Sequence, residues 1–212
     1  MSARELLREH DRLFVAFTRT LAPSEWDRPS LCSEWSTHDV LAHLVIGYSI
    51  PLHSLASSIL QHRGSFDRAN AQVAQSLASR QTPQELIDTF ERRIARPQGI
   101  GKLFPPRLLL GDHVLHHLDI ALALGRQTVI PDNIMDAVLE TEVRIPNPFV
   151  PARRNAAGLT LRATDTGWTL TRGDGARRAV QGRAIHLAPA LAGRTHALAS
   201  LTGDGVVQLD NR

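Results

Sequence analysis

The chain has 212 residues, of which 42% are hydrophobic and 21% charged, and its formal net charge is +3. This composition is typical of a folded globular protein, and the small, scattered excess of positive charge argues against nucleic-acid binding. The single cysteine, Cys32, excludes an internal disulfide and is typical of a reducing compartment. Charges interrupt the first turns, and no apolar run reaches the ~20 residues of a membrane span. We therefore expect a cytoplasmic protein without a membrane segment.

Apolar spacing, capping residues and prolines predict a series of helices in the first 148 residues. The clearest start is Thr82-Pro-Gln-Glu85, a capping box with proline at the first helical position. Gly125 follows the most apolar helix, that of residues 108–124, and can adopt the left-handed backbone conformation that ends a helix. The expected helices cover residues 2–21, 36–61 with a kink at Pro51, about 66–74, 83–95, 108–124 and 131–143, and residues 22–35 and 97–106 are expected to be loops.

The composition changes after three closely spaced prolines, Pro146, Pro148 and Pro151, which we interpret as a domain boundary between 1–148 and 149–212. The following residues alternate between apolar and polar around an Asp-Thr-Gly turn, a pattern that predicts a β-hairpin. The segments expected in this part are strands at 158–164, 168–172, 176–181 after an Asp174-Gly175 turn, and 205–209, with helices at 185–191 and 195–201. The predicted fold class is therefore α+β.

The helix expected at 108–124 carries the candidate functional residues. Asp112, His116 and Asp119 follow i, i+4, i+7 spacing and project from one side of it. Carboxylates and imidazoles within an apolar helix are costly to bury without partners, so a divalent metal is an economical explanation. Zinc accepts both ligand types, and His43 is the best candidate for a third ligand. Asp119 could instead orient an imidazole from outside the ligand set.

The spacing leaves alternatives open. His113 and His117 are also four residues apart, on a stripe turned by about 100°, and could be the ligands while Asp112 is merely exposed. The polar side chains could also be a partly exposed helix face, and His43 a hydrogen-bonded core histidine. Cys32 has no nearby activating pattern, so a nucleophilic role is not expected.

Two stretches resemble the mycothiol-dependent maleylpyruvate isomerase family, within the DinB-like group of metal-binding four-helix bundles. They are Trp35-Ser-Thr-His-Asp-Val-Leu-Ala-His43 and Asp112-His-Val-Leu-His116-His-Leu-Asp119, and weaker similarities lie at residues 66–70, around Trp168 and at 201–205. The resemblance implies a DinB-like four-helix bundle over 1–148, an α+β module over 149–212, and a metal bound by His43, Asp112 and His116. The family pattern has Glu at the position of Asp112, which weakens transfer of the specific reaction more than transfer of the metal site.

The resemblance implies a metal-dependent isomerase or transferase that uses mycothiol and acts on a small electrophilic substrate. The candidate site offers no obvious protein nucleophile, so a thiol or water activated by Zn²⁺ would have to supply one. Zinc binds sulfur well, which favours the thiol. The alternative is a non-catalytic small-ligand-binding or regulatory protein with a structural metal. The expected partners are a small substrate and a thiol, without nucleic acid or membrane, in a monomer or homodimer.

Overall fold

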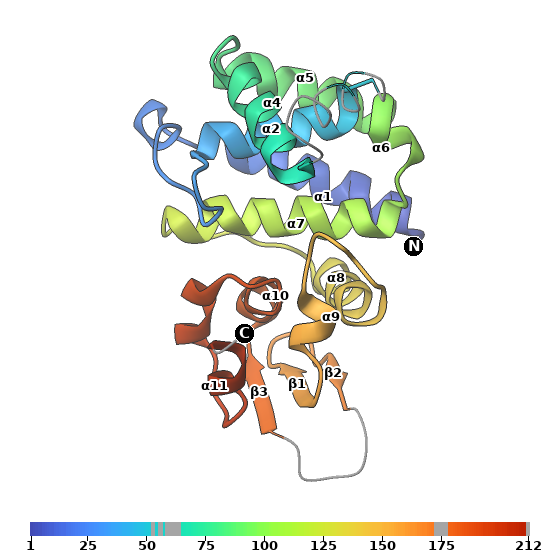
Figure 1. The fold of residues 1–212 in the computed structure, drawn as a ribbon, viewed down its shortest axis with the longest axis vertical. Helices are drawn as coiled ribbons and strands as arrows, with labels where there is room; N and C mark the ends of the chain where they lie inside the picture. The colour runs from blue at the N-terminus through green and yellow to red at the C-terminus, as the bar shows by residue number, and fades with distance from the viewer. Residues whose placement is uncertain (52–53, 55–56, 58–64, 172–177, 211–212) are drawn as a thin grey trace. The chain divides into compact units, whose positions relative to one another are not determined.

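The computed structural model describes residues 1–51, 54, 57, 65–171 and 178–210. These residues form mainly helices, with a small three-stranded sheet in the last third of the chain, so the α+β prediction is confirmed (Figure 1). Two compact units are present: Met1–Leu109 with Asp119–Thr128, and Leu110–Leu118 with Val129–Arg212. The helix α7 (Pro106–Ala123) is continuous and contributes its ends to the first unit and its middle turns to the second.

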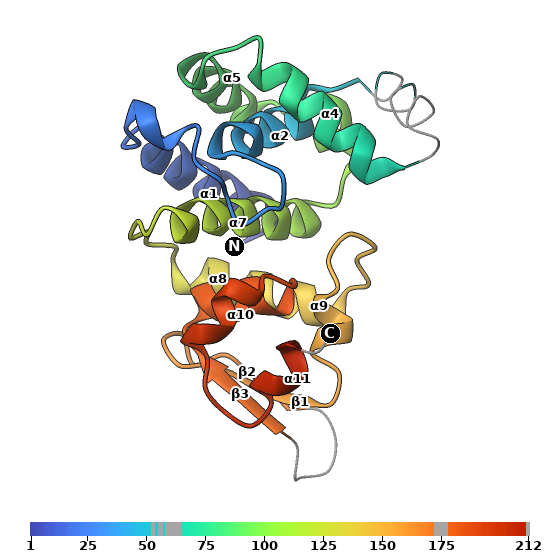
Figure 2. The same cartoon turned by 60° about the vertical axis from the view of Figure 1, so that its left-hand side comes forward.

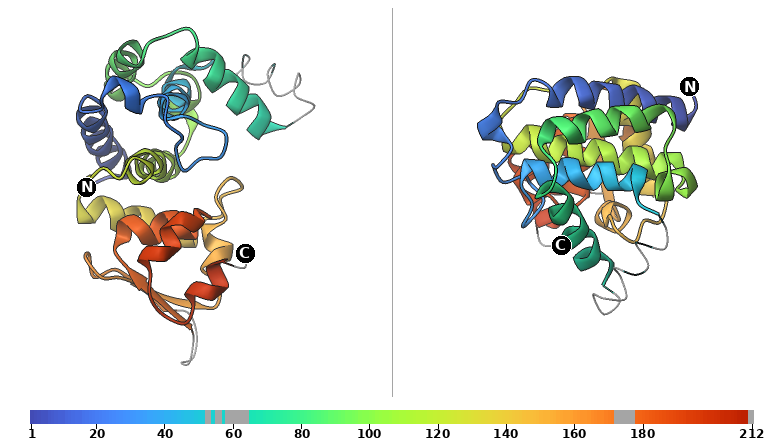
Figure 3. Two further views of the ribbon diagram at one scale, coloured as in Figure 1. Left: turned by 90° about the vertical axis from the view of Figure 1, so that its left-hand side faces the viewer. Right: turned by 90° about the horizontal axis from the view of Figure 1, so that it is seen from above.

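The first unit is built from helices whose N-terminal ends are capped by side chains, including the capping box predicted at Thr82. Its main helices are α1 (Ala3–Thr18), α2 (Thr37–Ser49), α4 (Phe66–Ala78) and α5 (Pro83–Ala95). Figure 3 shows α1, α2, α5 and α7 running alongside one another, and Figure 2 shows α4 next to α2. Capping boxes at Ser2, Ser36 and Thr82 satisfy amide groups that a helix start otherwise leaves unpaired.

Aromatic rings and one polar cluster fill the core of the first unit. Phe90 lies edge-on to Phe14, with 5.6 Å between ring centroids, and stacks on Tyr48 at 5.4 Å. The Tyr48 hydroxyl donates a hydrogen bond to the carboxylate of Asp11, which is fully buried beside His10. Burial, reinforced by the Asp11 charge, raises the pKa of Tyr48 well above its usual value.

The second unit places α8 (Asp132–Arg144), α9 (Ala152–Asn155) and α10 (Ala184–Leu191) together, beside a sheet of order β2-β1-β3. The predicted hairpin is present as β1 (Leu159–Ala163) and β2 (Thr169–Leu170), which pair antiparallel. β3 (Arg178–Gly182) pairs with β1 in parallel. Leu161 therefore lies opposite Leu170 on one side and opposite Val180 on the other, and all three side chains are buried.

The free edge of β3 is occupied by the residues that follow η2 (Thr195–Ser200). Thr202 pairs with Gln181, Gly205 donates its amide to the Ala179 carbonyl at 2.9 Å, and Asp204 accepts from the Ala179 amide at 2.7 Å. Gly203 adopts φ +111° against the backbone of Ala179, where a side chain would collide. Because residues 202–205 take this edge, the residues after them do not pair with β3.

Two local predictions are wrong, for physical reasons. The strand expected at 205–209 is the short helix α11 (Val206–Asp210), because the edge of β3 is already paired and Leu209 is buried as a helical residue. The loop expected at 97–106 contains the helix α6 (Gly99–Leu103), whose Gly101 packs against Tyr48 and the carbonyl of Gly47 where a Cβ has no room. Glycines and prolines there permit the close approach and also conceal the helix from sequence patterns.

The remaining expectations have mixed outcomes. α2 ends at Ser49, just before Pro51, and most of its expected continuation to Gln61 lies outside the described residues, as does the Asp174-Gly175 turn. The division at 148/149 stays a prediction.

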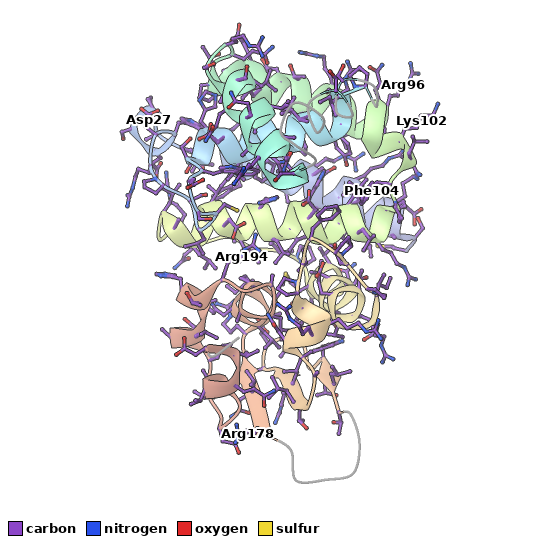
Figure 4. The ribbon with its side chains drawn as sticks, in the orientation of Figure 1. Asp27, Arg96, Lys102, Phe104, Arg178 and Arg194 are labelled. Atoms are coloured by element: carbon purple, nitrogen blue, oxygen red, sulfur yellow. The ribbon has the colours of Figure 1, made fainter. Side chains whose placement is uncertain are left out.

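No helix in the described ranges is both long and apolar enough to cross a membrane. The charged side chains of Asp27, Arg96, Lys102 and Arg178 are exposed and come from separate segments (Figure 4).

Candidate metal centre

The central helix of the candidate site is α7, and it is buried on every side. All positions from Leu109 to Ala121 are buried except Asp112. A helix that is enclosed in this way needs apolar residues all round, which is why the sequence shows no clear amphipathic pattern here. Polar side chains on such a helix require partners, and Asp112 is the position in this stretch where solvent has access.

Asp112 and His116 face each other across one turn of α7. The Nε2 atom of His116 lies 3.5 Å from Oδ1 of Asp112. Two ligands at about 2.1 Å from a tetrahedral zinc ion are separated by roughly 3.4 Å, so the pair has the spacing of adjacent zinc ligands. The side chain of His116 is 11% exposed and that of Asp112 is 41% exposed, so the ion would sit at the edge of the core.

His43 on α2 provides a third ligand atom. Atoms of His43, Asp112 and His116 that can bind a metal all lie within 4.8 Å of one another. The α7 residues before and after Asp112 and His116 belong to the first unit, as α2 does, and the helix between them is continuous. The three side chains predicted as ligands are thus brought together, and their imidazole and carboxylate donors fit a zinc ion with an open coordination position.

The ring of His43 is fixed by two neighbours. Its Nδ1 atom lies 3.1 Å from Oδ1 of Asn70 on α4, and its ring centroid lies 5.1 Å from that of Trp35. An amide oxygen accepts, so Nδ1 carries the proton and the lone pair of Nε2 is available to a metal. The same polar contact also explains why a histidine is stable at this position. Sequence reasoning missed Asn70, although residues 66–70 belong to the stretches that resemble the family.

A second group of possible ligand atoms shares His116 with the first. Atoms of Cys32, His116 and Asp119 also lie within 4.8 Å of one another. The Cys32 thiol donates to Oδ2 of Asp119 at 2.9 Å, and Asp119 is fully buried. Asp119 was expected as a ligand or as a residue that orients an imidazole, whereas Cys32 was not expected to act as a nucleophile, because the sequence around it lacks an activating pattern.

The competing register is not assembled in the described part of the chain. His113 and His117 are each 1% exposed, and neither belongs to a group of three possible ligands there. The side chains of His113 and His117 are buried in the core, whereas those of Asp112 and His116 lie close to His43. The alternative in which His113 and His117 bind the metal therefore lacks a third ligand among these residues.

A buried carboxylate lies behind Asp112. Glu142 on α8 is 2% exposed, and neither of its carboxyl oxygens has a hydrogen-bond partner among the described residues. Gly111 makes room for it, because a Cβ at that position would collide with Oε1 of Glu142. Burial, together with the charge of Asp112, raises the pKa of Glu142 to about 7, against a smaller opposing effect of Arg194. The buried Glu142 carboxyl is therefore partly protonated at neutral pH, which reduces its repulsion with Asp112.

Residues 7–99 match the family model described as the mycothiol maleylpyruvate isomerase N-terminal domain. This stretch includes His43, Asn70, Trp35 and Cys32. This match confirms the resemblance seen in the sequence. The matched residues do not include Asp112, His116 and Asp119 on α7, which carry the other part of that resemblance.

The fold of nearly the whole chain is shared with a mycothiol-dependent maleylpyruvate isomerase. The superposition on the crystal structure of that enzyme has a TM-score of 0.59 and a sequence identity of 15%. It covers 95% of this chain and 91% of the chain of that enzyme. A histidine-to-alanine mutant of the enzyme matches with the same values. At this identity the likeness establishes the fold. No curated protein sequence matches the chain.

Proposed function

We propose that this protein is a metal-dependent enzyme of the mycothiol maleylpyruvate isomerase family and that it uses a low-molecular-weight thiol. The observation that carries the proposal is the convergence of His43, Asp112 and His116 within 4.8 Å, with two of them at the spacing of zinc ligands. The fold shared with a mycothiol-dependent isomerase supports the choice of thiol. Mycothiol is therefore the proposed co-substrate, and Zn²⁺ the proposed metal.

A bound Zn²⁺ would lower the pKa of a coordinated thiol and so supply a thiolate at neutral pH. His43 and His116 would hold the ion through neutral imidazoles, and Asp112 would reduce its net charge. The partial exposure of Asp112 leaves a side from which a thiol and a substrate can approach. Asn70 would keep the proton of His43 on Nδ1 and thereby keep Nε2 directed to the ion.

The proposed reaction is addition of the thiolate to an electrophilic carbon of a small substrate. If the anionic adduct takes up a proton from solvent and is released, the reaction is a transfer. If rotation about the former double bond is followed by loss of the thiolate, the reaction is an isomerisation and the thiol is recovered. Maleylpyruvate is the first substrate to test because the enzyme that shares the fold is a maleylpyruvate isomerase. Asp112, shorter than the Glu of the family pattern, is a reason to test other electrophiles beside it.

A structural metal in a non-catalytic small-ligand-binding or regulatory protein is the second candidate. It is favoured by one observation, the second group of possible ligand atoms, in which Cys32 and Asp119 join His116, since ligand sets that contain cysteine are common in structural zinc sites. The two candidates differ in accessibility. A closed site would retain its metal but would not respond to added thiol, whereas the proposed enzyme would bind the thiol.

The deciding experiment combines metal analysis with turnover. Purified protein is expected to hold about one zinc ion per chain, and His116→Gln is expected to lose it. His113→Gln, a matched change on the same helix, is expected to keep it. Metal-loaded wild type should then consume maleylpyruvate only when mycothiol is present. Retention of the metal by His116→Gln with loss by His113→Gln would contradict the ligand assignment, and metal retention without any thiol-dependent turnover would favour the structural candidate.

A further inference from the structure

The side chain of Asp119 is a fully buried carboxylate beside a proposed metal ligand. It lies three residues after His116 on α7, and one of its oxygens is within 4.8 Å of a His116 ring nitrogen. Burying a carboxylate is costly unless hydrogen-bond donors surround it. The Cys32 thiol is one such donor, at 2.9 Å from Oδ2 of Asp119. The orientation of this carboxylate therefore depends on a residue 87 positions earlier in the chain.

The loop of residues 30–35 keeps Cys32 in that place. The amide of Leu31 donates to the carbonyl oxygen of Asp119 at 3.1 Å, so the main chain of the same α7 residue also binds the loop. Ser30 donates to the Trp35 carbonyl through its amide and its hydroxyl, at 3.0 and 2.9 Å, and its hydroxyl accepts from the Cys32 amide at 3.1 Å. The position of Cys32 is consequently fixed by main-chain contacts as well as by its thiol.

The same loop is anchored on α4 and lies against the other histidine of the proposed ligand set. Gln75 donates its side-chain amide to the Glu34 carbonyl at 3.3 Å. Glu34 adopts φ +67°, a left-handed conformation that is uncommon for a residue other than glycine and that costs free energy. The ring centroid of Trp35, the next residue, lies 5.1 Å from that of His43. One short loop thus contacts one proposed histidine ligand directly and, through Asp119, adjoins the other.

We infer that Cys32 is a positioning residue of the candidate metal centre, whose thiol holds the Asp119 carboxylate in place beside His116. This inference rests on the proposed function. The Nε2 atom of His116 faces Asp112 at 3.5 Å, so a metal bound there leaves Nδ1 to carry the proton. A carboxylate held close to the imidazole stabilises this proton and the ring orientation that goes with it. Cys32 needs only its S–H group for this role, and it bonds to neither metal nor substrate.

A positioning contact differs in measurable ways from a contact that only stabilises the loop. A contact that only stabilises the loop would change the midpoint of unfolding but not the zinc affinity of the folded protein. A positioning contact would change the affinity through Asp119, so the effects of Cys32 and Asp119 on zinc affinity would not add. It would also change which nitrogen of His116 carries the proton in the metal-free protein.

The test measures the zinc affinity of full-length protein by competition with a chelating dye. Cys32→Ala, which removes the donor, is expected to weaken binding by about 10-fold, the lower end of the range for residues that orient metal ligands. Cys32→Ser keeps a hydroxyl donor and is expected to recover most of the affinity. Ser33→Ala, a change on an exposed neighbour in the same loop, is the control and should match wild type. Asp119→Asn combined with Cys32→Ala should bind zinc no more weakly than Asp119→Asn alone.

Two further measurements examine the same contact. Methyl methanethiosulfonate converts the only thiol to a methyl disulfide and releases methanesulfinate, so the S–H donor is lost without a substitution. We expect a similar decrease in zinc affinity, and its recovery when a phosphine reduces the disulfide. In metal-free protein, at a pH where the ring is neutral, ¹⁵N NMR should show the His116 proton on Nδ1 in wild type and a mixture of both tautomers in Cys32→Ala.

The possible failures are distinguishable. Equal zinc affinities of Cys32→Ala and Ser33→Ala, or an unchanged affinity after modification of the thiol, would overturn the inference and leave the proposed function intact. Additive losses of affinity in the double variant would also overturn it. Absence of zinc binding by wild type would overturn both the inference and the proposed function.

Discussion

The Nδ1 atom of His43 lies 3.1 Å from the side-chain oxygen of Asn70, which comes from a different helix and fixes the proton on that nitrogen. Partners of this kind outside the ligand set typically contribute 10–100-fold to metal affinity. We therefore expect Asn70→Ala to weaken zinc binding by about 10–100-fold, measured by competition with a chelating dye. Gln75→Ala is the control, because Gln75 is also on α4 but donates to the backbone of Glu34. Equal affinities in the two variants would contradict the role of Asn70.

The buried carboxyl of Glu142 predicts a pH dependence of stability in the metal-free protein. Its pKa is about 7 in the folded state and near the ordinary 4.5 in the unfolded state, so the folded state binds the proton more tightly. The contribution is complete below pH 4.5 and is lost as the pH rises through 7, with a limit of about 3 kcal/mol. We expect denaturant unfolding of Glu142→Gln to lack this decline. Glu140→Gln, a more exposed change on the same helix, should retain it, and a decline that persists in Glu142→Gln would refute the assignment.

Gly111 and Gly47 should respond in opposite ways to alanine, although both lie inside helices. At Gly47 no atom lies within 4 Å of an added Cβ, so the better helix former should stabilise the protein by about 1 kcal/mol or less. At Gly111 the Cβ meets the Glu142 carboxyl, and overpacking should make Gly111→Ala less stable than Gly47→Ala by about 1–3 kcal/mol. Thermal unfolding measures both. Adding Glu142→Ala to Gly111→Ala should reduce the penalty of the glycine change, and strict additivity would show that the two side chains do not collide.

Tyr48 is the only tyrosine, so its ionisation can be followed directly. Burial and the Asp11 carboxylate raise its pKa well above 10, and the folded state therefore loses stability as the pH rises above 10. In an alkaline titration, phenolate absorbance should develop together with the loss of helical circular dichroism. Phenolate formation near pH 10 in a protein that is still fully helical would show that the hydroxyl is not buried as described.

A chain that ends near Pro148 should keep much of its helix content but expose apolar surface. Such a truncation separates α8 from α9 and α10, which pack with it in the second unit. The apolar residues Val138, Leu139 and Val143 on α8 are fully buried in the intact protein. We expect binding of a hydrophobic dye and a lower midpoint of unfolding. A stable, monomeric truncated protein without dye binding would instead support the predicted division at 148/149 into independent domains.

Periodicity, caps and turns were sufficient for most elements, because those signals are local. The capping boxes at Ser36 and Thr82 and the hairpin of β1 and β2 could all be read from short stretches. The parallel pairing of β3 with β1 and the helix at 206–210 could not, since both depend on which sheet edge is free. The spacing of Asp112 and His116 marked the candidate site, whereas Asn70 and Cys32 reach it only through folding. Their contacts join residues 27 and 87 positions apart, and no sequence pattern spans such separations.

The ring of Trp35 stands 5.1 Å from that of His43, which makes the indole an optical reporter of the candidate centre. A zinc ion on the far nitrogen of the His43 ring would place positive charge close to the indole, and indole emission responds to nearby charge. Zinc binding should therefore change the emission of Trp35. Trp26 lies beside His38, and Trp168 donates to Glu140, so phenylalanine at those two positions would leave a signal from Trp35 alone. Occupancy of the centre could then be followed in real time, without a coloured metal and without a substrate.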